Sequence, residues 1–476
     1  MSGERSPGVK LLLVGLIGAL LIIPLGMVYW LVSDRQHQAR VAQQSITAGW
    51  AGAQVIAGPV LVVPYTVTRT TNELVDGKTV TRRVESRELL YLSPSEQNLD
   101  TVIDPEVRSR GIIHQTVVYD AAIKGSALFD MPEDLDRLGI EPDQLLLDEA
   151  VMQLPISDPR GLQTDATLRL GEERLDLRPG LGNSQSGTGV HAFLDWSDGG
   201  QIQLEFGYGL RGSSAFSMVP RGEETNLSVR STWPHPSFSG GFLPSENDRE
   251  QSDEGFSAEW SISNLALGQS LVSKSAPTLP SAYGDPADPY YVDENTGSGD
   301  QIATIGLMEP VDLYKQVERS LKYGFLFIGF TFLAFLMFDI VAGARVASAE
   351  YLLTGAGLIL FFVMLLAFAE MIGFALAYVV ASAAIIGLLT SYSAAVLGGW
   401  RRAGFIALLL TGLYAVLYVL LNLETWSLVI GSLMLFFALA GVMYATRNIE
   451  WSKVSLVEEQ GDVEPGEASG GGSVPA

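Results

Sequence analysis

The run Leu11–Val32, LLLVGLIGALLIIPLGMVYWLV, decides the class of this protein. It contains 22 uncharged and mostly apolar residues, and about 20 such residues cross the hydrocarbon core of a bilayer. A cleavable signal peptide has a shorter apolar region followed by a small-x-small site. The sequence therefore predicts an uncleaved transmembrane signal-anchor helix at 11–32, after a short N-terminal segment at 1–10.

More apolar runs lie near the other end of the chain. They predict a C-terminal bundle at 323–445 whose five transmembrane helices occupy 323–343, 351–369, 372–397, 404–421 and 426–445. With 11–32 this makes a polytopic α-helical membrane protein with six spans and with both termini on one side. The tail at 446–476 is acidic and then rich in Gly and Ser, which is typical of a disordered segment.

The basic residues near the spans predict the orientation. Seven lie outside residues 33–322, and in the six-span arrangement all of them fall on the side of the N-terminus: Arg5, Lys10, Arg345, Arg401, Arg402, Arg447 and Lys453. Short loops rich in Lys and Arg stay in the cytoplasm, whereas long domains cross largely regardless of charge. We therefore expect a multi-pass inner-membrane protein with cytoplasmic termini and with residues 33–322 in the periplasm. The short outer loops would carry Glu370 and Glu424.

The central segment 33–322 differs from the rest of the chain in its charge and in the pattern of its apolar residues. It contains 42 Asp and Glu residues against 23 Lys and Arg residues, which argues against nucleic acid as a partner and against flat docking on anionic lipid. Short runs rich in β-branched and aromatic residues occur at 60–70, 84–92, 111–119, 166–170, 201–208, 225–231 and 256–262. This pattern predicts a large β-rich, antiparallel, sandwich-like extracytoplasmic domain. The Pro-rich stretch 274–300 is expected to be a loop.

The sequence contains few of the residues and motifs that are typical of catalytic or metal-binding sites. There is no cysteine and there are four histidines, and none of the common nucleophile, phosphate-loop or zinc-protease motifs occurs. We therefore predict no enzymatic activity, no cofactor and no metal site. In SDPRG at 157–161, Asp158 is expected to cap a turn that Pro159 and Gly161 shape.

Two candidate sites follow from the sequence. Trp233, His235 and Phe238 lie in WPHPSF, where Trp, Phe and Pro make a rigid apolar contact surface, unless Trp233 and Phe238 fill the core instead. Asp339 lies inside the second predicted span, and an intramembrane carboxylate either belongs to an ion or proton path or reaches toward the cytoplasmic interface near Arg345.

The chain resembles the CreD family of inner-membrane proteins along most of its length. The matching segments are AGPVLVVPY (57–65), ISDPRGL (156–162), YGLRGS (208–213), STWPHPSFSGGFLP (231–244), EPVDLY (309–314), RSLKYGFLFI (319–328), EYLLTGAGL (350–358), IGFALAY (372–378), LYVLLNLE (417–424) and GSLMLF (431–436). The chain departs from the family pattern at Glu350 and Met371, where the family usually has Gln and His. The resemblance implies a link to cell-envelope integrity and, in some bacteria, control by a two-component system. It implies no catalytic residues.

The function expected from these observations is non-enzymatic support of envelope integrity or of the envelope-stress response. The lipid bilayer is one partner, and the extracytoplasmic domain would bind an envelope protein, a lipid or a cell-wall component. The alternative is a transporter or flippase-like protein that uses the C-terminal helix bundle.

Overall fold

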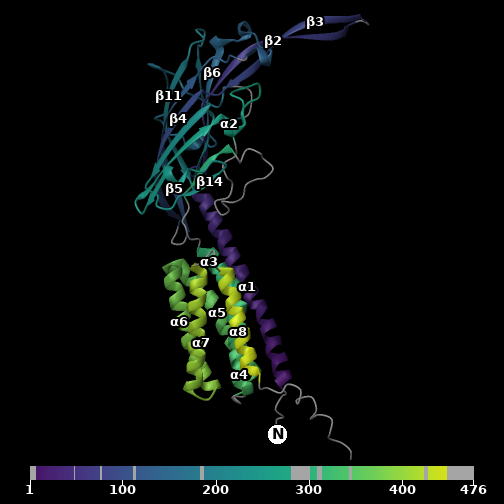
Figure 1. The fold of residues 1–476 in the computed structure, drawn as a ribbon, viewed down its shortest axis with the longest axis vertical. Helices are drawn as coiled ribbons and strands as arrows, with labels where there is room; N and C mark the ends of the chain where they lie inside the picture. Colours follow the sequence, from purple (N-terminus) through teal and green to yellow (C-terminus); the bar gives the residue numbers. More distant parts are fainter. Residues whose placement is uncertain are drawn as a thin grey trace, which may run out of the picture. The chain divides into compact units, whose positions relative to one another are not determined.

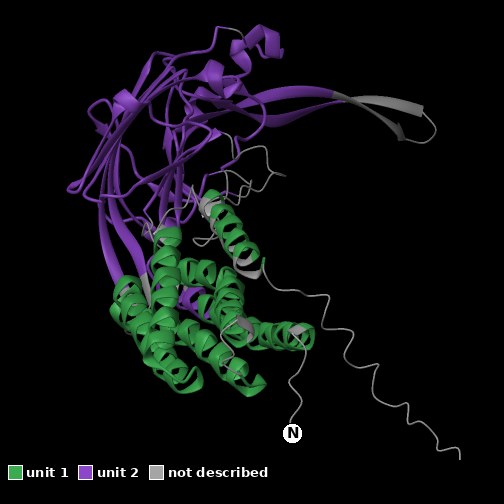
Figure 2. Ribbon diagram, turned by 60° about the horizontal axis from the view of Figure 1, so that its bottom comes forward, with its two compact units in different colours: residues 1–37, 311–476 green, residues 38–310 purple. Residues whose placement is uncertain are grey.

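The computed structural model describes residues 7–47, 49–75, 78–110, 114–133, 135–182, 187–279, 301–307, 313–341, 346–422 and 427–447. The chain forms two units, one of residues 1–37 with 311–476 and one of residues 38–310 (Figure 2). Most of the predicted loop at 274–300 and nearly all of the predicted tail at 446–476 lie outside the described residues.

The first unit is helical. Its helices are α1 (Pro7–Thr47, which continues into the second unit), α3 (Leu313–Lys322), α4 (Gly324–Val341), α5 (Ser348–Ile372), α6 (Phe374–Val396), α7 (Trp400–Asn422) and α8 (Ser427–Thr446). The helices α4 to α7 run alongside one another (Figure 1). The interior of a bilayer offers no water to the backbone, so every N–H and C=O group must find a hydrogen-bond partner within the protein. A helix provides these partners within the segment itself, and the long apolar runs therefore form helices.

Five helices in the described ranges are long and apolar enough to cross a membrane: Gly8–Thr47, Leu313–Asp339, Ser348–Ile372, Phe374–Val396 and Trp400–Leu421. Five of the six predicted spans therefore lie on such helices. The sixth, at 426–445, lies on α8, where the apolar helix found among the described residues is the shorter section Gly431–Gly441. The total of six spans stays a prediction.

The ends of two helices differ from what the sequence indicated. Glu370 was expected in an outer loop but lies in the last turn of α5, and the chain reverses at Gly373, whose φ of +78° favours glycine. The other predicted loop residue, Glu424, lies outside the described residues.

The second unit is β-rich. A four-stranded sheet has the order β1 (Gln54–Ala57), β12 (Ala215–Val219), β18 (Ala303–Gly306), β14 (Ser237–Gly240). A six-stranded sheet has the order β17 (Val272–Ser273), β3 (Lys78–Leu92), β2 (Val60–Val75), β6 (Ala150–Pro155), β10 (Gly189–Leu194), β9 (Arg178–Pro179). An eight-stranded sheet has the order β15 (Arg249–Ser252), β16 (Gly255–Ser263), β13 (Glu224–Ser231), β4 (Glu96–Arg110), β5 (His114–Phe129), β11 (Ile202–Ser213), β7 (Thr167–Leu170), β8 (Glu173–Arg174).

Most strand pairs in this unit are antiparallel, and β1 with β12 and β13 with β4 are parallel. The expectation of a large β-rich domain with antiparallel sheets is therefore confirmed, and the two-layer sandwich stays a prediction. Short helices connect the strands: α2 (Asn264–Leu267) and 3-10 turns at Leu135–Leu138, Pro142–Gln144, Leu147–Glu149, Pro159–Gly161 and Glu246–Asp248.

One apolar core serves all three sheets. The alternation of buried and solvent-facing side chains is clear in β13, where Leu227 and Val229 are buried and their neighbours are more exposed, because successive side chains of a strand point to opposite faces. The core cluster joins these two residues to Leu61 of β2 and Phe216 of β12. In β13 this core covers one face and leaves the other for solvent, and so it positions the site described next.

Candidate functional site

The outer face of the eight-stranded sheet carries polar side chains in two rows that cross six strands in register. Pairing from β16 through β13, β4, β5 and β11 to β7 aligns Ser261, Asn226, Asn98, Ser126, Glu205 and Arg169 in the first row. The second row aligns Glu259, Ser228, Asp100, Lys124, Gly207 and Thr167 in the same way, with polar side chains at every position except Gly207. The row between them, which includes Leu99 and Leu227, points into the core.

A hollow of about 1210 Å³ lies over these two rows, and we call it the sheet trough. All twelve residues of the two rows line it, together with Asp248 and with the residues of the row between them on β16, β13, β4, β5 and β11. Six strands at about 4.8 Å spacing make each row about 24 Å long. The trough is therefore long enough for an extended polymer lying across the strands.

Some polar side chains of the trough bind a protein partner, whereas others are left for a ligand. Asn226 donates to the Asn98 side chain at 3.2 Å, and Arg230 binds Asp100 at 2.9 Å from beside the trough. In the described part of the chain, Lys124 and Arg169 have no carboxylate partner within 4.0 Å. Such side chains bind hydroxyl and amide groups through hydrogen bonds.

The charge of the trough limits what it can bind. Four carboxylates line it (Asp100, Glu205, Asp248 and Glu259) against two cations (Lys124 and Arg169). A net acidic surface repels phosphates, so an anionic lipid or a nucleic acid is a poor ligand for it. Within the described ranges, no group of three His, Cys, Asp or Glu residues is arranged to hold a metal ion.

The segment predicted as a contact lies elsewhere in the second unit. Trp233 and Phe238 are half-buried and pack against the apolar core, and Phe238 makes edge-to-face contacts with Phe256 and Trp260 at ring separations of 5.7 and 5.9 Å. The indole N–H of Trp233 donates to the His235 carbonyl at 3.1 Å, while the His235 side chain is exposed. Core packing thus accounts for much of both aromatic side chains, and a contact role for this segment stays a prediction.

Asp339, the predicted intramembrane carboxylate, is buried in the first unit. Its Oδ1 accepts a hydrogen bond from Lys10 Nζ at 3.0 Å and from the Val346 N–H at 3.3 Å. The partner is thus a lysine of α1. The residue expected nearby, Arg345, lies outside the described residues.

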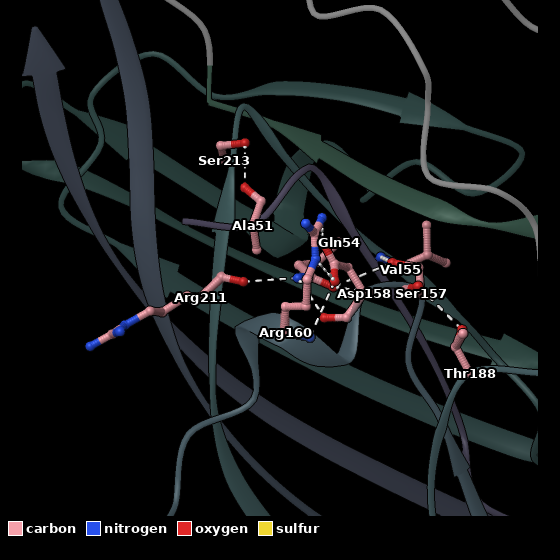
Figure 3. A network of polar contacts seen from close by, with 9 residues as sticks. All are labelled: Ala51, Gln54, Val55, Ser157, Asp158, Arg160, Thr188, Arg211 and Ser213. Atoms are coloured by element: carbon pink, nitrogen blue, oxygen red, sulfur yellow. Dashed lines mark hydrogen bonds and ion pairs between the residues drawn. The ribbon is translucent and has the colours of Figure 1, made fainter. Parts of the chain in front are cut away.

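The SDPRG segment forms the expected turn and belongs to a larger network (Figure 3). Asp158 caps the short helix Pro159–Gly161 by accepting from the Arg160 N–H at 3.1 Å, and the Arg160 guanidinium donates to both carboxylate oxygens at 2.8 and 2.7 Å. These hydrogen bonds from Arg160 hold the pKa of the Asp158 carboxyl below its usual range.

Gln54 joins this turn to two strands. Its fully buried side chain donates to the carbonyls of Asp158 and Arg211 at 3.2 and 2.9 Å and accepts from Ser157 Oγ at 3.3 Å. Gly161 is required beside it, because a Cβ there would lie 2.2 Å from the Arg211 carbonyl oxygen. The network therefore fixes β1 to β11 and has a structural role.

Comparison with known proteins identifies the family to which the chain belongs. A family model described as inner membrane protein CreD matches residues 6–452. The inner membrane protein CreD of Escherichia coli (strain K12) is 31% identical over 448 residues, which cover 92% of this chain and 92% of that protein.

Two solved structures share far less. A candidate nutrient binding protein from Legionella pneumophila is 8% identical and covers 45% of this chain and 68% of its own, with a TM-score of 0.21. An M1 zinc metallopeptidase from Deinococcus radiodurans is 7% identical and covers 36% and 38%, with a TM-score of 0.16. These two similarities are too weak to indicate a fold or a function. The family model and the Escherichia coli protein, in contrast, match nearly the whole length, and the chain therefore belongs to the CreD family of inner-membrane proteins.

Proposed function

We propose that this protein supports the integrity of the cell envelope without catalysing a reaction, and that its β-rich unit binds a wall polymer in the sheet trough. The observation that carries the proposal is the pair of polar rows in register across six strands. A ligand that follows these rows must be extended and must offer hydrogen-bonding groups at regular intervals. A wall glycan, which is rich in hydroxyl and amide groups, has this chemistry.

The proposal places residues 33–322 on the periplasmic side of six spans, with both termini in the cytoplasm. Within the first unit, the ion pair of Lys10 with Asp339 puts the start of α1 at the same end as the end of α4. Tyr29 donates to Glu318 at 3.2 Å, which puts the end of the apolar run of α1 beside α3. The helices α1 and α4 therefore run in opposite directions, as the six-span arrangement requires.

The experiment measures how much full-length protein in detergent sediments with purified wall sacculi. The test variant carries Asn98→Leu and Asn226→Leu, which remove the amide pair of the first row. We expect its binding to sacculi to be about 30-fold weaker, because each of the two lost side chains removes a hydrogen bond that contributes about 1 kcal/mol.

The matched control carries Glu96→Leu and Glu224→Leu on the same two strands. These residues pair with each other two positions before the amide pair, and they do not line the trough. We expect the control to bind sacculi like the unchanged protein. Equal loss of binding in both variants, or no binding by the unchanged protein, would contradict the proposal.

A further inference from the structure

A second pocket in the β-rich unit is built around a buried arginine. Arg221 follows β12 and is 6% exposed. Its backbone N–H donates to Gln97 Oε1 at 3.1 Å, so the backbone of the loop is fixed by a buried side chain of β4. The backbone position of Arg221 is thus set by the fold.

The guanidinium of Arg221 is poorly satisfied by the protein. A guanidinium has five N–H donors. One nitrogen, Nη2, donates to the Thr278 carbonyl at 2.9 Å, and Nε is buried without a hydrogen-bond partner among the described residues. No carboxylate lies within 4.0 Å of Arg221 in that part of the chain. A buried charge without a counter-charge is costly.

The pocket beside Arg221 has a volume of about 270 Å³ and a lining suited to an anion. Hydroxyl groups come from Ser93 and Ser275, and a side-chain amide comes from Gln269. The described lining contains no Asp or Glu, although residues 33–322 carry 42 acidic against 23 basic residues. Burial lowers the pKa of Arg221 to about 10, so the guanidinium stays charged at neutral pH.

We propose that this pocket binds a phosphate group, held by the free N–H groups of Arg221 and by the hydroxyls of Ser93 and Ser275. Planar guanidinium groups bind phosphate oxygens through paired hydrogen bonds, and a tetrahedral anion uses the further donors that the hydroxyls supply. The site is independent of the sheet trough, since the two pockets share no lining residue. The phosphate is either free or part of a lipid headgroup.

The alternative is that Arg221 only holds the segment around Thr278 in place. Binding distinguishes the two roles, because a structural arginine gives no response to added anions. The experiment titrates full-length protein, in a detergent without phosphate, with inorganic phosphate at constant ionic strength and follows binding by calorimetry. Parallel titrations use dihexanoyl phosphatidic acid and acetate.

We expect phosphate to bind the unchanged protein, and Arg221→Gln to weaken this binding about 10- to 100-fold, since hydrogen bonds to charged groups are the strong ones. The double variant Ser93→Ala with Ser275→Ala keeps the arginine and should bind about fivefold more weakly. It keeps the test valid if Arg221→Gln does not fold. The control Arg249→Gln, at an exposed arginine outside the pocket, should bind normally.

The two phosphate probes identify the source of the group. Equal affinity for both supports a free phosphate, and tighter binding of the phosphatidic acid supports a lipid headgroup. Absence of phosphate binding by the unchanged protein, equal binding of acetate, or unchanged binding in both pocket variants would overturn the proposal.

Discussion

Lys10 and Asp339 form an ion pair between α1 and α4, with Lys10 Nζ 3.0 Å from Asp339 Oδ1. The Asp339 side chain is 2% exposed and the Lys10 side chain is 26% exposed. When one partner of a buried pair is removed, the other is left as an uncompensated charge, and this costs more than the pair itself contributes. The two side chains should therefore behave as a coupled pair.

Replacing either partner alone should destabilise the protein more than replacing both. We expect Lys10→Met and Asp339→Leu each to cost about 3 kcal/mol, and the double variant to recover most of that loss. Thermal unfolding of the purified protein in detergent measures these differences. Lys322→Met breaks the pair with Glu318, in which the lysine side chain is 61% exposed, and should cost about 1 kcal/mol or less.

The same site tests the transporter alternative. A transporter that moves a proton or an ion through Asp339 would lose its function in Asp339→Asn while still inserting into the membrane. If the double variant Lys10→Met with Asp339→Leu is folded and still complements an envelope-sensitive strain, Asp339 carries no such path. Loss of complementation in that folded variant would favour the transporter.

Two tyrosines of the bundle should respond differently to loss of their hydroxyl groups. The Tyr351 hydroxyl is buried without a hydrogen-bond partner among the described residues, whereas the Tyr378 hydroxyl donates to the Tyr414 carbonyl at 2.7 Å. We expect Tyr351→Phe to leave the melting temperature unchanged or higher. Tyr378→Phe should cost about 1 kcal/mol, because it removes a hydrogen bond that is made. Equal destabilisation by both changes would show that Tyr351 has a partner.

The Asp158 turn should make part of the stability depend on pH. Because the folded state lowers the pKa of Asp158, its stabilisation is complete above the unfolded pKa of about 3.9 and is lost as pH falls through the lower folded value. At pH 7, Asp158→Ala should cost about 1 kcal/mol, the usual contribution of a helix cap. Thermal unfolding between neutral pH and about pH 3 should show this difference shrink.

The control for this pH series is Asp253→Ala, at an exposed turn residue. It should lower the melting temperature little. An Asp158→Ala effect that stayed constant down to the lowest pH would mean that the carboxylate does not stabilise the turn through its charge.

The elements with a local signal were predictable from the sequence. Long apolar runs indicated the helices, and each of the seven predicted strands overlaps a strand of the β-rich unit. The β4 strand, Glu96–Arg110, was not predicted, because its charged outer face hides the alternation of Leu99, Thr101 and Ile103. Charge on one face of a strand is compatible with a buried other face.

The candidate sites depend on contacts that no local pattern contains. The trough requires the register of six strands, and residues 98 and 226 become neighbours only through the parallel pairing of β4 with β13. Arg221 looks like an ordinary loop arginine until the chain packs around it. The turn at Asp158 was predictable, since Asp, Pro and Gly each restrict the backbone locally, but its link through Gln54 was not.

The most direct test of the account uses a single cysteine in the trough. The chain has no cysteine, so Ser228→Cys, in the second row, introduces a unique thiol. In cells with a permeabilised outer membrane and an intact inner membrane, a membrane-impermeant maleimide should label this thiol, and added wall fragments should slow the labelling. Labelling only after the inner membrane is broken, or at a rate that wall fragments leave unchanged, would contradict the account.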